Sequence, residues 1–186
     1  MSGKTSAAAN ICASACKRHG TERIQLSHGF GPFVRPDSRL LILGSFPSVK
    51  SREAQFYYGH PQNRFWPLLA ALCHENSPGS REEKERFLTR HHVALYDVIE
   101  SCTIVGSSDS SIDDVVVTDL APLLAQSEIG AHVFTNGAKA YQMYMKFTFP
   151  RLSIPAVKLP STSPANAAFS FNRLIRDWGE QLLPLL

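Results

Sequence analysis

Residues 44–66 hold the side chains of this chain that are best suited to chemistry. The segment follows an apolar run at residues 40–43 and combines hydroxyls, a carboxamide, a histidine and several aromatic rings. A connection of this length between a strand and a helix is usually functional rather than only structural. Its side chains suit the binding of a planar, polar, uncharged ring next to a phosphate.

The elements that must position this segment alternate between strands and helices from residue 40 onward. Short apolar runs predict strands at residues 40–43, 93–99, 132–135 and 156–159. Helical spacing of apolar residues predicts helices at residues 64–75, 81–91, 118–126 and 138–147. A last helix is expected after residue 163, with Ser163 as its N-cap and Pro164 as its first residue.

This alternation predicts an α/β fold. Parallel strands joined by helices form a sheet that is covered on both faces. We therefore expect three α/β/α layers around a central four-stranded, mainly parallel sheet. Ligands of such sheets bind beyond the carboxyl ends of the strands. The polar loops follow those ends, so we expect them to converge on one pocket: residues 44–63, 97–114, 136–139 and 160–166.

The length of 186 residues favours one domain with a real core. Residues 1–25 are rich in Ala, Ser and basic side chains and predict a mobile extension, with the single domain at residues 26–186. The extension is either a tail without a task, a polyanion contact or a mitochondrial targeting segment. The net charge of +3 is too mild to establish or exclude nucleic-acid binding.

The cysteines and the hydropathy pattern exclude other classes. Cys12 and Cys16 lie in the extension, and Cys73 and Cys102 are far apart, so we expect free thiols in a reducing, intracellular compartment. The pair His91-His92 has no further ligand at metal-binding spacing, so neither a metal nor another cofactor is expected. No apolar stretch is long enough to predict a membrane span.

Four motifs occur in order along the chain. They are Gly-Ser-Phe-Pro-Ser-Val-Lys-Ser from residue 44, Tyr-Tyr-x-His-Pro-x-Asn-x-Phe-Trp from residue 57, Ala-Leu-Tyr-Asp-Val-Ile from residue 94 and Ser-Thr-Ser-Pro-Ala-Asn from residue 161. Together they resemble the uracil-DNA glycosylase superfamily, and within it the hypoxanthine-DNA glycosylase (DNA-deoxyinosine glycosylase) branch. The similarity covers residues 26–186. It implies a uracil-DNA glycosylase-like fold and cleavage of N-glycosidic bonds to deaminated bases.

The resemblance has one departure at the catalytic position. Other branches place Asn or Asp where this chain has Phe46, and phenylalanine cannot orient a water molecule. The hypoxanthine branch shares this departure and implies that Asn63 is the catalytic residue, with its carboxamide oxygen accepting a hydrogen bond from the attacking water. The alternative is that Asn63 caps the helix that follows it.

The resemblance also implies a base-binding set of Phe46, Tyr58 and Asp97. Tyr58 is expected to stack on the flipped base, or else to be a core tyrosine under the loop. An ionised Asp97 accepts hydrogen bonds only, so it would favour the N1–H of hypoxanthine over the bare N1 of adenine. It would not reject uracil, whose N3–H is also a donor. The alternative is that Asp97 fixes the loop after its strand.

Short polar side chains are expected to contact DNA phosphates, because hydroxyls and amides at a helix N-terminus suit an anion. Each hydroxyl can also serve a local turn or cap, and the histidine in this set can simply brace its loop. A modest basic rim is expected from Lys50, Arg52, Arg64, Lys139 and Lys158. The predicted DNA-binding residues are Ser45, Ser48, His60, Ser161, Thr162, Ser163 and Asn166.

These residues predict a monofunctional DNA glycosylase that acts on hypoxanthine in base excision repair. We expect a monomer that binds double- or single-stranded DNA, in the cytoplasm of a prokaryote or the nucleus or mitochondrion of a eukaryote. Two alternatives remain at this point. One is a uracil or thymine mismatch glycosylase, and the other is a catalytically silent binder of damaged DNA or nucleotides.

Overall fold

The computed structural model of the chain describes residues 23–105 and 112–186. Its centre is a four-stranded parallel sheet in the order β3-β2-β6-β7. The predicted three-layer α/β/α fold with a central parallel sheet is thereby confirmed. The strands are β2 (Leu40–Gly44), β3 (Val93–Asp97), β6 (Val133–Asn136) and β7 (Ala156–Leu159).

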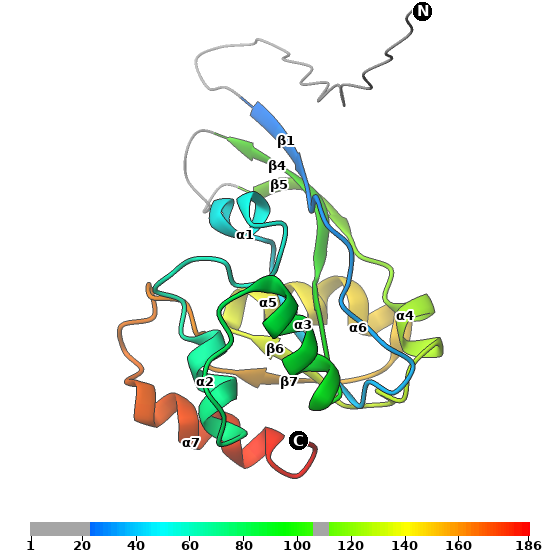
Figure 1. The fold of residues 1–186 in the computed structure, drawn as a ribbon. Helices are drawn as coiled ribbons and strands as arrows, with labels where there is room; N and C mark the ends of the chain where they lie inside the picture. The colour runs from blue at the N-terminus through cyan, green and yellow to red at the C-terminus, as the bar shows by residue number, and fades with distance from the viewer. Residues whose placement is uncertain (1–22, 106–111) are drawn as a thin grey trace, which may run out of the picture.

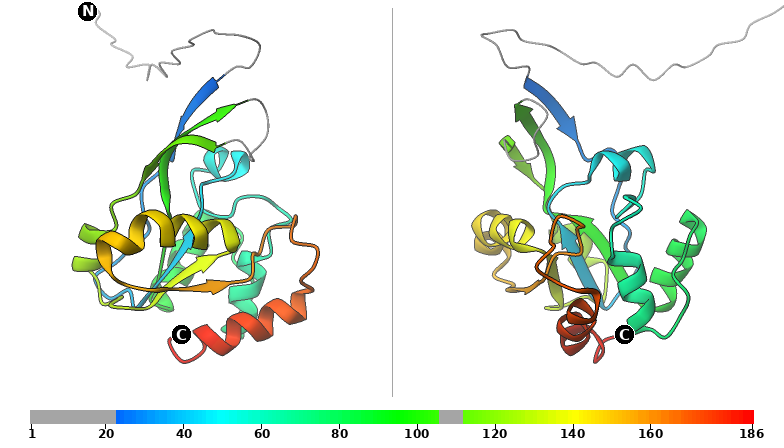
Figure 2. Two further views of the ribbon diagram at one scale, coloured as in Figure 1. Left: turned by 180° about the vertical axis from the view of Figure 1, so that it is seen from behind. Right: turned by 90° about the vertical axis from the view of Figure 1, so that its left-hand side faces the viewer.

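The sheet is covered by helices on both faces, as the right-hand view of Figure 2 shows. The neighbouring strands β2 and β3 are buried along their whole length, which explains their continuous apolar sequences. One face carries α5 (Ala138–Met143), η1 (Tyr144–Thr148) and α6 (Phe149–Leu152). The other carries α2 (Phe65–Leu72), α3 (Arg81–Arg90) and α7 (Phe171–Leu182).

The helices on this second face begin and pack for identifiable reasons. The α3 helix starts with a capping box, in which Ser80 and Glu83 each accept from the other's backbone N–H. The α7 helix buries Leu174, Trp178 and Leu182 on one face and packs against α2. Two short helices, α1 (Val49–Glu53) and α4 (Ala121–Ala125), complete the described helices.

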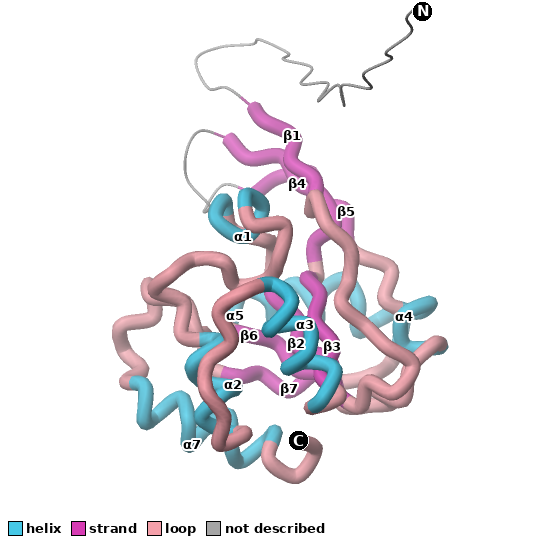
Figure 3. Tube along the Cα trace, viewed as in Figure 1, coloured by secondary structure: helices cyan, strands magenta, loops and turns pink. Residues whose placement is uncertain are grey.

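A second, three-stranded antiparallel sheet was not anticipated from the sequence. It consists of β1 (Arg23–Ser27), β4 (Ile99–Val105) and β5 (Ile112–Val117), in the order β1-β4-β5. Figures 1 and 3 show it extending beyond the helical layers at the top of the molecule. The expected loop 97–114 is therefore largely strand, and residues 23–25 belong to the fold, not to the extension. The rest of the expected extension, residues 1–22, lies outside the described residues, as do Cys12 and Cys16.

The last helix also begins later than the sequence predicts. Its N-cap is Ser170, whose side chain accepts from the N–H of Arg173, and not Ser163. Residues 160–170 form an irregular connection because their carbonyls are used elsewhere: several accept from the side chain of Arg64. The predicted cap at Ser163 and Pro164 is therefore wrong, and this serine caps a turn instead of a helix.

The described residues contain neither a membrane-spanning helix nor a group of metal ligands. Across residues 23–105 and 112–186, no helix has both the length and the hydropathy to cross a membrane. In the same ranges, no group of three or more His, Cys, Asp and Glu side chains is placed to hold a metal ion. Cys102 is buried and Cys73 is partly buried, and no disulfide joins them.

Candidate active site

A pocket of about 190 Å³ lies beyond the carboxyl ends of all four parallel strands. Gly44 and Asp97 end the neighbouring strands β2 and β3 and lie opposite each other in register. Asn136 ends β6, and the connections after β2 and after β7 supply the rest of the lining. The lining is Gly44, Ser45, Phe46, Pro47, Ser48, Ser51, Tyr57, Tyr58, Asn63, Asp97, Asn136, Ser161, Thr162 and Ser163.

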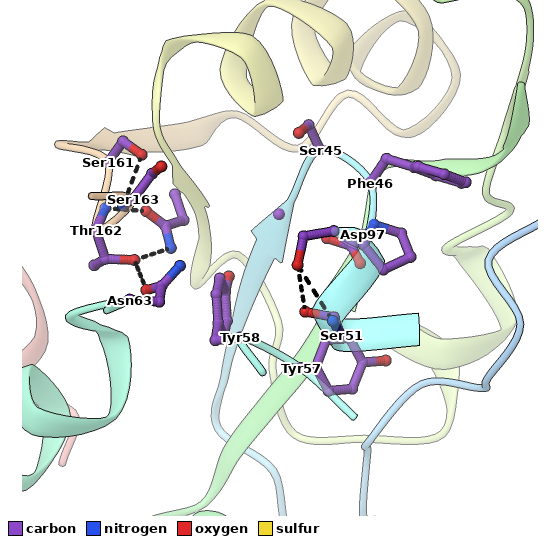
Figure 4. A pocket seen from close by; sticks show the side chains of 14 residues that line it. Ser45, Phe46, Ser51, Tyr57, Tyr58, Asn63, Asp97, Ser161, Thr162 and Ser163 are labelled. Carbon is purple, nitrogen blue, oxygen red and sulfur yellow. Dashed lines mark hydrogen bonds between the residues drawn. The ribbon is translucent and has the colours of Figure 1, made fainter. Parts of the chain in front are cut away.

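This pocket brings Asn63 together with the three predicted base-binding residues. Phe46, Tyr58 and Asp97 all line it, although Phe46 and Asp97 are 51 positions apart in the chain. The convergence follows from the topology, since parallel strands present their carboxyl ends at one edge of the sheet. Figure 4 shows Tyr58 between Asn63 and Asp97.

The carboxamide oxygen of Asn63 is already occupied within the protein. It accepts from the backbone N–H of Phe65 at 3.0 Å and from the hydroxyl of Thr162 at 2.9 Å. Two donors use both lone pairs of an amide oxygen. The expectation that this oxygen orients a water molecule is therefore corrected. The amide nitrogen points away from Thr162, toward Tyr58 and the pocket (Figure 4).

Thr162 is predicted to bind a phosphate, yet its side chain is 0% exposed. Its backbone N–H donates to the Asn136 carboxamide oxygen at 2.9 Å, and its hydroxyl accepts from the Asn136 amide nitrogen at 2.9 Å. The same hydroxyl donates to Asn63. The side chain is thus not available to a phosphate and serves the interior of the site instead.

Tyr58 is held edge-on to the pocket by its neighbours. Its ring stacks on Phe65 with centroids 3.7 Å apart, so one of its faces is covered. Its backbone has a positive φ of 51°, a conformation that is rare for non-glycine residues. The hydroxyl is buried without a hydrogen-bond partner among the described residues. Burial, with a smaller contribution from Asp97, raises the tyrosine pKa, and the nearby Asn136 side chain opposes that shift, so this hydroxyl stays protonated and can donate.

Asp97 is a buried carboxylate, only 5% exposed, at the bottom of the pocket. Its Oδ2 accepts from His28 Nε2 at 2.8 Å, and its Oδ1 lies against the Cα of Gly44, where a Cβ would overlap it. The pKa of Asp97 is raised by burial, and the hydrogen bond from His28 opposes that shift. Gly44 is therefore required for the close approach of this carboxylate.

Phe46 forms an apolar part of the pocket wall. The guanidinium of Arg52 lies over its ring, 5.5 Å from the centroid, and Arg52 also donates to the Pro47 carbonyl at 2.6 Å. The predicted rim residue Arg52 is thus tied to the loop that it follows. The Phe46 side chain offers no polar atom to a ligand, so its contribution is limited to shape and contact.

The predicted DNA-binding hydroxyls in loops 44–51 and 160–166 make mostly local bonds. Ser48 caps α1 by accepting from the Ser51 N–H at 3.2 Å. Ser161 accepts from the Ser163 N–H at 3.2 Å, and Ser163 accepts from the Ala165 N–H at 3.3 Å. Hydroxyls that cap turns still have a proton to donate, so phosphate contacts by Ser48, Ser161 and Ser163 remain a prediction.

The other members of the predicted set differ in position. Ser45 lines the pocket with a partly exposed side chain. His60 is absent from the pocket lining and braces its own loop, since its Nδ1 accepts from the Gln62 N–H at 3.2 Å. Asn166 closes the turn by donating to the Ser161 carbonyl at 2.8 Å. Its contact with DNA, like those of Ser45 and His60, remains a prediction.

A second hollow, of about 580 Å³, adjoins the pocket and is lined by two of the five basic residues of the predicted rim. Lys139 and Lys158 line it, and it shares Ser45, Asn136 and Ser161 with the pocket. Gly137, with a positive φ of 100°, allows this junction because a Cβ there would lie 2.9 Å from the Cβ of Ser161. The junction thus forms a continuous surface from basic rim to pocket.

Sequence reasoning missed three residues of this site. The sequence places the loop 136–139 at the pocket without singling out Asn136, because an Asn-Gly pair is typical of a turn. His28 and Tyr57 belong to the aromatic and polar wall behind Asp97, and Tyr57 donates to the Gly31 carbonyl at 2.8 Å. The polar residue at each strand end was the available signal, and it pointed to Asn136 as well as to Asp97.

Comparisons with known proteins agree on one family. The family model of the uracil DNA glycosylase superfamily matches residues 32–179. A relative from Methanosarcina acetivorans, named hypoxanthine DNA glycosylase, is 33% identical over 151 residues, which are 80% of this chain and 93% of the relative. One of the same name from Methanosarcina barkeri is 31% identical over 113 residues, 60% of this chain and 72% of the relative.

A solved structure supports the same relationship. A solution NMR structure from Methanosarcina acetivorans, described as a candidate uracil DNA glycosylase, superposes with a TM-score of 0.70 at 32% identity. The superposition covers 84% of this chain and 96% of that chain. The similarity therefore spans the parallel sheet and the loops that form the pocket.

Proposed function

The chain belongs to the uracil DNA glycosylase superfamily, and we propose that it removes hypoxanthine from DNA. It is a DNA glycosylase, a hydrolase that acts on N-glycosidic bonds, and DNA is its substrate. The names of its relatives support hypoxanthine as the base. The damaged nucleotide is deoxyinosine, the product of adenine deamination.

The observation that carries this proposal is the pairing of Asp97 with Tyr58 around a single pocket. Hypoxanthine differs from adenine by an N1–H donor and an O6 acceptor in place of a bare N1 and an amino group. An ionised Asp97 accepts hydrogen bonds, and the buried Tyr58 hydroxyl has one to donate. This acceptor and donor complement hypoxanthine and oppose adenine.

Base removal requires the nucleotide to leave the helical stack. Phe46 and Tyr58 then contact the base, and Asp97 accepts from its N1–H. The sugar passes through an oxocarbenium-like state, so a positioned water molecule is sufficient as nucleophile. Asn63 is the catalytic residue at the reacting bond. The phosphates beside the everted nucleotide are contacted by short polar side chains, namely Ser45, Ser48, His60, Ser161, Ser163 and Asn166.

The enzyme acts as a monofunctional glycosylase and leaves an abasic site. Strand cleavage by bifunctional enzymes needs an amine that forms a Schiff base with the sugar. The lining of the pocket contains no lysine among the described residues, and Lys139 and Lys158 line the adjoining hollow instead. The protein works as a monomer on double- or single-stranded DNA, in the compartment that holds the genome.

The test is base release from defined duplexes. Oligonucleotides with a single inosine, uracil, xanthine or mismatched thymine are incubated with the protein and then treated with alkali, which breaks the strand at abasic sites. We expect release of hypoxanthine well above release of uracil. Release from uracil alone would replace hypoxanthine as the assigned base, because Asp97 also accepts from the N3–H of uracil. Binding without any release would identify a silent damage binder.

A further inference from the structure

The orientation of the Asn63 side chain is determined by its hydrogen bonds. A backbone N–H can only donate, so the atom of Asn63 that faces the Phe65 N–H at 3.0 Å is the oxygen. The Thr162 hydroxyl approaches the same atom at 2.9 Å. The amide nitrogen has no hydrogen-bond partner among the described residues and faces the pocket (Figure 4).

Asn136 determines which way the Thr162 hydroxyl donates. The Asn136 oxygen accepts from the Thr162 N–H, so its amide nitrogen is the atom 2.9 Å from the Thr162 hydroxyl oxygen. The hydroxyl accepts that bond and has its single proton left for Asn63. The three side chains therefore form a directed chain from β6, through the connection after β7, to the start of α2.

The backbone of Thr162 is also held, so the chain of bonds rests on a fixed support. The Arg64 backbone N–H and its Nε both donate to the Thr162 carbonyl, at 3.1 and 3.3 Å. Arg64 follows Asn63 directly. The segments that carry Asn63 and Thr162 are therefore connected by these two Arg64 bonds as well as by the bond between the two side chains. Side chains locked in this way supply preorganised groups to a reaction.

We propose that Thr162 and Asn136 are positioning residues that hold the Asn63 amide nitrogen toward the pocket, so that Asn63 acts on the substrate as a hydrogen-bond donor. This inference rests on the proposed glycosylase function of the pocket. It moves the catalytic contact of Asn63 from the oxygen to the nitrogen, and it changes the role from accepting a hydrogen bond from water to donating one to the base.

A donor at this place fits the charge that develops in the reaction. The C1′–N9 bond breaks with its electron pair moving to the purine, so negative charge spreads over the ring nitrogens and O6. A water oxygen then bonds to C1′, and the proton that it loses is taken up by the departing purine through solvent. A donor to the purine stabilises this charge, whereas a donor to the water oxygen would weaken the nucleophile.

The donor role is tested by the variant Asn63→Asp. It preserves the shape and the oxygen that accepts from Phe65 and Thr162, and it replaces the NH₂ group by an acceptor. We expect the single-turnover rate on an inosine duplex to fall roughly 10²–10³-fold, as when one donor to a developing anion is removed. A rate equal to or above wild type would show that Asn63 acts as an acceptor and would overturn the donor role.

The positioning role is tested by Thr162→Val, which removes the hydroxyl and keeps the volume. We expect a roughly tenfold lower single-turnover rate, with the Kd for the duplex unchanged and Thr162→Ser close to wild type. The matched control is Thr135→Val, another 0% exposed threonine, whose hydroxyl donates to the Val157 carbonyl at 3.3 Å. An unchanged rate in Thr162→Val would overturn the positioning role.

A readout that needs no activity separates this inference from the proposed function. Nitrogen relaxation of the Asn63 side-chain amide should give an order parameter near that of rigid backbone in wild type and in Thr162→Ser, and below about 0.6 in Thr162→Val. A mobile amide in wild type would overturn the lock. A rigid amide in a protein that releases no hypoxanthine would support the lock and reject the proposed function.

Discussion

At the scale of single residues, the two carboxylate oxygens of Asp97 have different surroundings. One carboxylate oxygen is bound to His28 inside the protein, and the other lies at the pocket against Gly44. A buried carboxylate costs free energy when it is ionised, and burial accordingly raises its pKa. A cost of this kind is typical of functional sites, where stability and activity conflict.

Replacement of Asp97 by asparagine should therefore stabilise the folded protein and lower the rate of hypoxanthine release. Because the folded-state pKa of Asp97 is raised, its contribution to stability is present below the ordinary aspartate pKa and is lost as pH rises through the raised value. Asparagine has no charge to desolvate, and its oxygen can still accept from His28. We expect Asp97→Asn to raise the free energy of unfolding at neutral pH, and hypoxanthine release to fall roughly 10- to 100-fold.

The measurement is urea unfolding of both proteins across acidic to neutral pH, beside base-release rates. The stability gap should close as pH falls and Asp97 becomes protonated in the wild-type protein. A gap that is independent of pH would mean that Asp97 carries no desolvation cost. Unchanged selectivity between hypoxanthine and adenine would remove Asp97 as the base reader.

Sequence reasoning selected the residues of the site better than it selected their atoms. Asn63, Tyr58 and Asp97 follow from motif positions and from the rule that strand ends converge, and the structure brings them to one pocket. The use of the Asn63 oxygen depends on Thr162, which is 99 positions away. A contact at such a separation has no local signature, so the choice between oxygen and nitrogen was not predictable.

At the scale of elements, Arg64 joins the start of α2 to the connection between β7 and α7. Its guanidinium donates to the carbonyls of Ser163 at 2.8 Å and Asn166 at 3.0 Å, and also to those of Thr162 and Phe169. Sequence analysis placed this arginine on a basic rim. The planar guanidinium with its five donors instead satisfies a segment that has no regular backbone partners.

Arg64→Lys should therefore destabilise the protein, although the charge is kept. A lysine ammonium has three donors at one point and cannot reach carbonyls spread along this connection. We expect a loss of about 2–3 kcal/mol in the free energy of unfolding, since hydrogen bonds to charged groups are among the stronger ones. Thermal unfolding and limited proteolysis between residues 160 and 170 would measure it.

The control for this prediction is Arg176→Lys, on the exposed part of α7. Arg176 pairs with Asp177 on the surface at 2.8 Å, a type of ion pair that contributes little. We expect a change within about 0.5 kcal/mol for the control. Equal stability of Arg64→Lys and wild type would show that solvent satisfies these carbonyls and that Arg64 is not a structural clamp.

Local signals predicted elements well where burial and capping agreed. The bounds of β7 match the prediction, and those of α3 differ by one residue, because the capping box of Ser80 and Glu83 marks the start of this charged helix. The start of α7 was placed too early because Ser163-Pro164 carries the same local signal as a real cap. What distinguishes Ser163 from the real cap at Ser170 is a long-range contact: Arg64 donates hydrogen bonds to the carbonyls of Ser163 and Asn166.

At the scale of the whole molecule, the parallel sheet was predictable and the antiparallel sheet was not. Continuous apolar strands such as β2 are unmistakable, whereas β4 contains Glu100, Ser101 and Thr103 and pairs with β5 through irregular register. Strands of mixed polarity with bulges give a weak periodic signal. The strand β1 gives a weak signal for the same reason, and it begins at residue 23, three residues before the predicted boundary, where it pairs with β4.

DNA must approach the pocket over a surface with little excess positive charge. The net charge of +3 means that attraction must come from a local arrangement, and Lys139 and Lys158 line the hollow next to the pocket. Each lysine that neutralises a phosphate releases counterions, which makes affinity depend on salt. We expect Lys139→Gln and Lys158→Gln each to weaken binding equally for inosine and adenine duplexes and to reduce the salt slope by about one.

The contrast that decides this prediction is Arg39→Gln, which removes the same charge at the opposite rim. Arg39 is exposed and directly precedes β2, so it lies at the amino end of the sheet, away from the pocket. Non-specific attraction by total charge would lower affinity similarly in all three variants. Contacts at the hollow would lower it for the lysines alone, because screening confines the effect of a surface charge to about 10 Å at 0.1 M salt. If Lys158→Gln and Arg39→Gln reduced the salt dependence of affinity equally, the DNA would not bind along this hollow.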